Sequence, residues 1–239
     1  MEYMLEGKEV LIMRFEEMKP SEIEEVLQKA PIVYIPWGSL EWHGVQNPIG
    51  LDALKVYNLC LKAAEKTGGV VFPPIFCGFE TMKPYLGFKK TIEISRETVQ
   101  ALAREYLDQL YDEGFRIFVI LMGHYGAKHV EALKEVGEEF LGKHPDARGI
   151  FAPDPAFLAQ HGISGGHADF YETSLMMFFR PELVDLGLLP KDRDITIEAD
   201  GIGGGDPRKA SIEEGRRIAE ILVGEIASKV GSLMKELKK

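Results

Sequence analysis

The run FRIFVILMG at 115–123 constrains the fold more than any other part of this chain. An apolar run of this length between turn residues is typical of a buried β-strand. Shorter apolar runs predict further strands at 32–36 and 148–153 and one within 68–76 that is stopped by Pro73 and Pro74. Strands at this spacing leave room for a helix between each pair, so the arrangement of the intervening segments decides the fold class.

Amphipathic patterns occupy these intervals. The clearest begins at an N-cap, Ser95, and ends at Gly114, with Val99, Leu102 and Tyr106 on one face. We predict further helices at 52–66, after 123, at 170–180 and at 211–236, and one near the N-terminus capped by Ser21. Strands that alternate with helices indicate βαβ units. The chain is therefore predicted to be an α/β protein, one domain over residues 1–239, with a mostly parallel central sheet and helices on both faces.

Composition excludes several classes of protein. The chain has 239 residues and a formal net charge of −10, which disfavours a nucleic-acid binder because such a protein needs a basic face. Its two cysteines, Cys60 and Cys77, are too few for a disulfide framework or a Cys-rich zinc site. No uncharged apolar run approaches the ~18 residues of a membrane span, and the N-terminus lacks a signal-peptide pattern. We expect a cytoplasmic protein that binds neither nucleic acid nor membranes.

Ligands of parallel sheets bind beyond the carboxyl ends of the strands, so the loops that follow strands are the places to look for a site. The segment GSLEWHGVQNPIGLD follows the 32–36 strand and contains Glu41, His43 and Asp52. In an extended stretch, Glu41 and His43 point to the same face. Two carboxylates and an imidazole suit zinc, manganese or iron. Taken alone, the segment is equally well a polar loop with surface acids.

A second segment, MGHYGAKHVEAL, follows the 115–123 strand. His124 comes directly off that strand between Gly123 and Gly126, and small residues let the backbone approach a ligand closely. The alternative is a turn histidine that packs against the next helix or caps it. We interpret His129, about one helical turn later, as a surface residue.

A third segment, GISGGHADFYETSLMMFF, places His167 in a glycine-rich loop and Glu172 at the start of a helix. The helix dipole alone favours an acid at that position, and a loop histidine can simply be exposed to water. Considered together, three histidines lie in glycine-rich loops, and carboxylates accompany two of them. This clustering favours a metal site.

These segments, in this order, resemble the creatininase (creatinine amidohydrolase) family. The shared motifs read GSLEWHG, NPIGLD, GHYG and HADFYETS, followed by PELVDLG and GDPRKAS, and they extend from about residue 31 to about residue 217. The resemblance implies a three-layer α/β/α domain that assembles as a homo-oligomer, usually a hexamer. It also implies hydrolysis of a non-peptide C–N bond of a small-molecule substrate at a centre with one or two metal ions.

The resemblance further implies a role for individual residues. A divalent metal ion, zinc first and manganese or iron as alternatives, would be bound by Glu41, His43, Asp52 and His124, with Asp52 able to bridge two ions. His167 would be the general acid or base, and Glu172 would assist as a proton carrier or a ligand. The residues expected to contact substrate are Trp42, Glu80 and Tyr125.

Two departures from the family pattern bear on the substrate. Creatininases carry a metal-binding Glu at the position of Gly126, and they place tryptophans around the substrate, whereas residues 151–170 contain none. We therefore expect a small amide, a formamide or a cyclic amide other than creatinine. The alternative from another class is a non-catalytic relative that binds a small molecule or a partner and keeps its metal as a structural brace.

Overall fold

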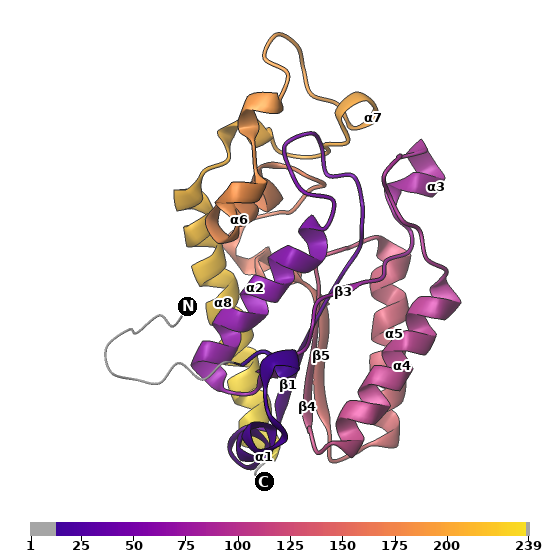
Figure 1. The fold of residues 1–239 in the computed structure, drawn as a ribbon, viewed down its shortest axis with the longest axis vertical. Helices are drawn as coiled ribbons and strands as arrows, with labels where there is room; N and C mark the ends of the chain where they lie inside the picture. Colours follow the sequence, from indigo (N-terminus) through magenta and orange to yellow (C-terminus); the bar gives the residue numbers. More distant parts are fainter. Residues whose placement is uncertain (1–12, 238–239) are drawn as a thin grey trace.

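The computed structural model describes residues 13–237, and Figure 1 shows a central sheet with helices on both of its faces. Strand β1 (Ile32–Gly38) pairs in parallel with β2 (Val70–Val71), β3 (Ile75–Phe76) and β4 (Ile117–Met122). On its other side, β4 pairs in parallel with β5 (Arg148–Pro153). Every pairing between these strands is parallel, which confirms the predicted α/β class.

The all-apolar character of β4 follows from burial on both sides. Ile117, Val119 and Leu121 belong to one core cluster, and the alternate residues Phe118 and Ile120 belong to another. The first cluster is covered by α2 (Leu51–Thr67), α6 (Phe170–Phe179) and α8 (Ile212–Leu237). The second is covered by α1 (Pro20–Lys29), α4 (Arg96–Asp112) and α5 (Ala127–Lys143). These two sets of helices form the outer layers of the domain (Figure 1).

Some boundaries differ from the sequence prediction. Helix α1 begins at Pro20, and its start is closed by the Glu22 carboxylate, which accepts from the Lys19 amide at 2.6 Å, so the predicted Ser21 cap is wrong. Ser95 does cap α4 and accepts from the Thr98 amide.

Several short elements were not predicted. They are α3 (Met82–Leu86), α7 (Ile197–Asp200) and the 3₁₀ turns Phe15–Glu17, Asp154–Phe157, Ala159–His161, Pro181–Leu183, Leu186–Leu188 and Pro207–Lys209. Within residues 13–237, no helix is both long enough and apolar enough to cross a membrane.

Two glycines at strand ends let α2 approach the sheet. A Cβ atom at Gly38 would lie 2.3 Å from the Ala53 amide nitrogen, and one at Gly123 would lie 2.1 Å from the Asp52 carbonyl oxygen. Real Cβ atoms do not come this close to backbone atoms, so only glycine fits at either position. The first turn of α2, with Asp52 on it, therefore lies directly against the carboxyl ends of β1 and β4.

This contact predicts a strong effect of Gly123→Ala. The added methyl group must displace the backbone at Asp52, so we expect a loss of ~1–3 kcal/mol in the free energy of unfolding. Gly142→Ala is the matched control, because a Cβ atom there meets nothing within 4 Å and the helix gains a better helix former. Chemical denaturation of both variants measures the difference. Equal stability of the two would contradict the close packing of α2 against the strand ends.

Candidate metal centre

A cavity of about 310 Å³ lies at the carboxyl ends of β1 and β4. Its walls come from the loops after these strands, from residues 80–82 and from the 165–172 segment. All the residues predicted to bind metal or to act in catalysis line it, and so do two of the predicted substrate contacts. They are Glu41, His43, Asp52, Glu80, His124, Tyr125, His167 and Glu172.

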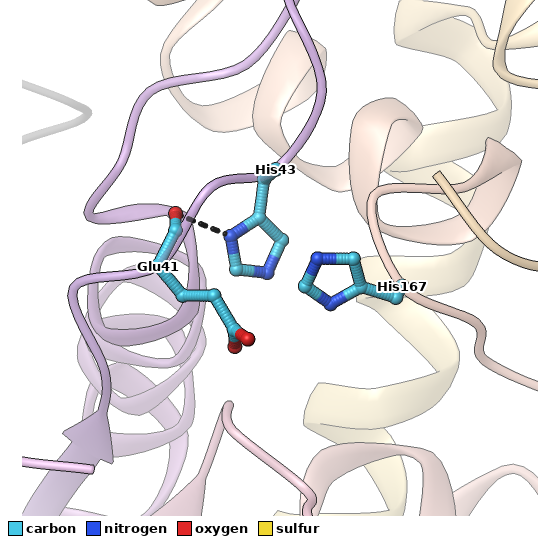
Figure 2. A group of neighbouring side chains, drawn as sticks. All are labelled: Glu41, His43 and His167. Carbon is cyan, nitrogen blue, oxygen red and sulfur yellow. Dashed lines mark hydrogen bonds between the residues drawn. The ribbon is translucent and has the colours of Figure 1, made fainter. Parts of the chain in front are cut away.

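The potential ligand atoms form three overlapping groups, in each of which they lie within 4.8 Å of one another. Figure 2 shows the first, in which the Glu41 carboxylate lies beside the rings of His43 and His167. Asp52 belongs to both of the others, one with Glu41 and His124 and one with His43 and Glu172. Among residues 13–237, no single group contains all four predicted metal ligands. Asp52 is the residue that the second and third groups share.

Backbone carbonyl groups orient all three histidines. In each ring, one nitrogen lies within hydrogen-bonding distance of a carbonyl oxygen, and this contact leaves the other nitrogen for the site. Metal-binding histidines are typically held in this way. The pairs are His43 Nδ1 with the Glu41 carbonyl at 2.9 Å, His124 Nε2 with the Phe79 carbonyl at 2.9 Å, and His167 Nε2 with the Trp42 carbonyl at 2.8 Å.

The nitrogens that remain face buried carboxylates. His43 Nε2 lies 2.9 Å from Asp52 Oδ1, and His124 Nδ1 lies 3.3 Å from Glu41 Oε2. Asp52 Oδ2 accepts from the Ser39 hydroxyl at 2.7 Å. The buried Glu41 Oε2 has the contact with His124 but, among residues 13–237, no hydrogen bond. A buried carboxylate oxygen without a partner is costly unless a cation neutralises it. This arrangement of oxygen and imidazole ligands fits a divalent metal ion.

The pKa values of His43 and His124 agree with a site for a cation. Burial disfavours a charged imidazole, but the Asp52 carboxylate outweighs burial and raises the pKa of His43 to about 9. Burial is outweighed in the same way by the carboxylates of Asp52 and Glu41, which lie 3.5 Å and 3.3 Å from Nδ1 and raise the pKa of His124 to about 10. In the metal-free protein, protons therefore supply the positive charge that a metal ion supplies when it is bound.

His167 has the opposite tendency. Burial, together with the positive charge of His43, lowers its pKa below the usual value for histidine. The two rings stack with centroids 4.3 Å apart. His167 is accordingly a neutral imidazole at pH 7, with one nitrogen free to accept a proton.

Glu172 lies at the start of α6 and is held at both oxygens. Its Oε1 accepts from the Lys55 ammonium at 2.8 Å and from the Tyr125 hydroxyl at 2.6 Å. Its Oε2 accepts from the Ala168 amide at 2.7 Å and lies 3.7 Å from His43 Nε2. The carboxylate is thus fixed in one orientation beside the candidate ligands.

Two of the predicted substrate contacts have other partners. Glu80 lines the cavity, but its carboxylate accepts from the Lys128 amide in the first turn of α5 and so caps that helix. The Trp42 side chain lies outside this cavity; it lines a neighbouring one together with Phe88, with the two rings 4.8 Å apart. Tyr125 lines the cavity and holds Glu172.

The prediction that His129 lies on the surface is wrong. Its side chain is fully buried, Nδ1 accepts from the Phe79 amide at 3.4 Å, and its ring lies against that of His124. The sequence pattern of α5 missed this because Phe79, which packs against His129, is far away in the sequence. Sequence reasoning also missed Lys55, a charged residue on the buried face of α2.

Comparisons with known proteins agree with the motifs. The family model described as creatininase, creatinine amidohydrolase, matches residues 16–230. Creatinine amidohydrolase of Pseudomonas putida is 25% identical over 229 residues, which cover 83% of this chain and 88% of the relative. The mycofactocin precursor peptide peptidase of Mycobacterium ulcerans (strain Agy99) is 28% identical over 84% of each chain.

Solved creatininase structures have the same fold. The crystal structure of creatinine amidohydrolase superposes with a TM-score of 0.77 at 24% identity and covers 93% of this chain and 98% of the other. A manganese form gives a TM-score of 0.77 at 23% identity, covering 91% and 97% of the two chains. A zinc form of a variant gives 0.75 at 24% identity, covering 91% and 96%.

The shared position of Asp52 in two ligand groups predicts a severe effect of Asp52→Ala, namely loss of most bound metal. Ser39→Ala removes only the hydrogen bond to Asp52, so it should weaken metal binding by ~10–100-fold. Asp146→Ala, at an exposed position, is the control. Elemental analysis and competition with a chelator measure occupancy and affinity. Full metal occupancy in the Asp52 variant would refute the ligand assignment.

The raised pKa values of His43 and His124 predict that metal binding releases protons. Both rings carry an extra proton at pH 7, and an ion must displace it. The affinity for zinc should therefore rise with pH until pH passes the higher of the two pKa values, about 10 for His124. Calorimetry in two buffers of different ionisation enthalpy measures the release. Identical heats in both buffers would contradict it.

Proposed function

Because this chain belongs to the creatininase family, we propose that its cavity cleaves the C–N bond of a small amide, formamide or cyclic amide. The chain is a metal-dependent hydrolase of that family, with ligand groups suited to zinc or manganese. One observation carries the proposal: Glu41, Asp52 and His124 converge in the wall of the cavity, and the buried Glu41 Oε2 atom has no hydrogen bond from residues 13–237.

We propose Glu41, His43, Asp52 and His124 as the residues of the metal centre. Glu41, Asp52 and His124 form one ligand group, and His43 lies beside the shared Asp52 at 2.9 Å. A divalent ion held by these residues would supply Lewis acidity for activating water and polarising the carbonyl group of the substrate. Three protein ligands with one open position are typical of a catalytic zinc site, and the group of Glu41, Asp52 and His124 has this number. The main-chain carbonyls of Glu41 and Phe79 orient the rings of His43 and His124.

His167 is proposed as the general base and acid. Its Nε2 proton is directed to the Trp42 carbonyl, so Nδ1 is the nitrogen that remains for the reaction. The lowered pKa keeps this nitrogen unprotonated near pH 7, as a base that takes a proton from water requires. The same imidazole then returns the proton to the departing nitrogen of the substrate. Glu172 is proposed to support the positive charge that develops on the neighbouring rings.

The cavity itself supports a small substrate. A volume of about 310 Å³ is at the lower end for ligand pockets. Tyr125 and Glu80 are proposed as its polar walls, whereas the Trp42 indole lines the neighbouring cavity. Gly126 offers neither a carboxylate nor a covering side chain, so creatinine is not the proposed substrate.

We also propose a cytoplasmic homo-oligomer, a hexamer, of which each chain is one domain. Val45 and Leu86, which are 46% and 40% exposed, line the second cavity together, and exposed apolar side chains of this kind are common at subunit interfaces. Light scattering that detects only a 26.8 kDa species would contradict the oligomer.

A substrate panel tests the proposed reaction. Metal-free protein is reconstituted with zinc, manganese or iron and assayed with formamides, cyclic amides and creatinine. We expect turnover of at least one formamide or amide and creatinine turnover below ~1 per second, because Gly126 provides no ligand. Faster creatinine hydrolysis would show that Gly126 does not matter. A fully metal-loaded protein with no turnover on any substrate would favour a non-catalytic relative with a structural ion.

The role of His167 predicts a selective defect in His167→Gln. The variant should keep its metal content and its melting temperature but lose ~10²–10⁴-fold in kcat, the usual contribution of a general acid–base group. His161→Gln is the matched control, because that histidine lies outside the cavity and pairs with Glu225. Loss of metal from the His167 variant would assign His167 to the ligands instead.

A further inference from the structure

Lys55 is a buried cation inside the candidate site that the proposed reaction does not use. It lies on α2, about one turn after Asp52, and its side chain is fully buried. Its ammonium lies 2.8 Å from Glu172 Oε1, 3.2 Å from Asp154 Oδ2 and 3.5 Å from the Gly123 carbonyl. A lysine is almost never fully buried without such partners, so this ammonium is an integral part of the centre.

The ammonium divides the two oxygens of Glu172. Oε1 is occupied by Lys55 and the Tyr125 hydroxyl, and the ring of Tyr125 also lies 4.8 Å from the ammonium. Oε2 is the oxygen that faces His43 in the group of His43, Asp52 and Glu172. It already accepts a hydrogen bond from the Ala168 amide. A second metal ion at that group would therefore share Glu172 with a positive charge already bound to the same carboxylate.

No further carboxylate can come from the position of Gly126. A Cβ atom there would lie 2.7 Å from the Glu80 carbonyl oxygen and 3.3 Å from Glu80 Cβ. The main chain at Glu80, with a φ of 57°, thus fills the space that a longer side chain would need. The second group is left with Glu172 and the shared Asp52 as its only carboxylates.

We propose that the Lys55 ammonium takes the place of a second metal ion, so that each chain holds one divalent ion, at Glu41, Asp52 and His124. This inference rests on the proposed metal-dependent hydrolysis and deepens it. Like charges repel strongly in a buried site, and here the fixed charge is the lysine. Glu172 then remains free of metal, as a positioned carboxylate beside His43 and His167.

Metal stoichiometry tests this proposal without a substrate. Metal-free protein is titrated with zinc or manganese, passed through a desalting column and analysed for bound metal per chain. We expect one ion for the natural chain and a second ion in Lys55→Met. Lys62→Met is the matched control, since this exposed lysine of the same helix pairs with Glu65, and the variant should bind one ion.

Removal of Lys55 leaves two buried carboxylates uncompensated, so the single variant can fail to fold. The double variant Lys55→Met with Asp154→Asn removes one charge of each sign. If the single variant does not fold, the double variant is used for the same measurement. In addition, Glu172→Gln in the natural chain should still bind one ion, and loss of an ion there would overturn the proposal.

Two ions of similar affinity in the natural chain, or a single ion in a folded chain without Lys55, would also overturn it. Either result leaves the proposed hydrolysis intact. A chain that binds no ion at all would overturn both.

Discussion

The close approach of α2 to the sheet is the constraint on which the site depends. Gly38 and Gly123 end two neighbouring strands, and neither has a side chain to keep Asp52 away. Asp52 can therefore reach the carboxylate of Glu41 and the ring of His124, which follow these strands. The parallel pairing of β1 with β4 places both strand ends at the same edge, so residues far apart in the sequence meet without a long loop.

Charge compensation explains which residues surround Asp52. Glu41, Asp52, Asp154 and Glu172 are all buried, and isolated buried carboxylates are strongly unfavourable. Lys55 balances Asp154 and Glu172, whereas the imidazoles, or a metal ion, balance Glu41 and Asp52. One fixed cation and one exchangeable cation thus stabilise the same cluster, and only the exchangeable one faces the cavity.

The sequence predicted the strands, the long helices and the residues that converge, because apolar periodicity and glycine-flanked polar residues are local signals. It failed where the answer depends on contacts between distant segments. His129 has the spacing of a surface residue, and only the fold shows that Phe79 packs against it. The Phe79 carbonyl orients His124, and a main-chain contact of this kind cannot be predicted from the type of side chain. Lys55 was a missed signal, since a lysine among Ala53, Val56 and Cys60 on the buried face of a helix requires an acidic partner.

Anomalous diffraction from zinc-loaded crystals tests the central claim most directly, because it locates the ion without reference to activity. A single peak is predicted within ~2.0–2.2 Å of ligand atoms of Glu41, Asp52 and His124. The remaining position on the ion should open to the cavity beside His167. A peak at another place in the chain, or an ion whose coordination is completed by protein atoms alone, would contradict a catalytic metal centre at this edge of the sheet.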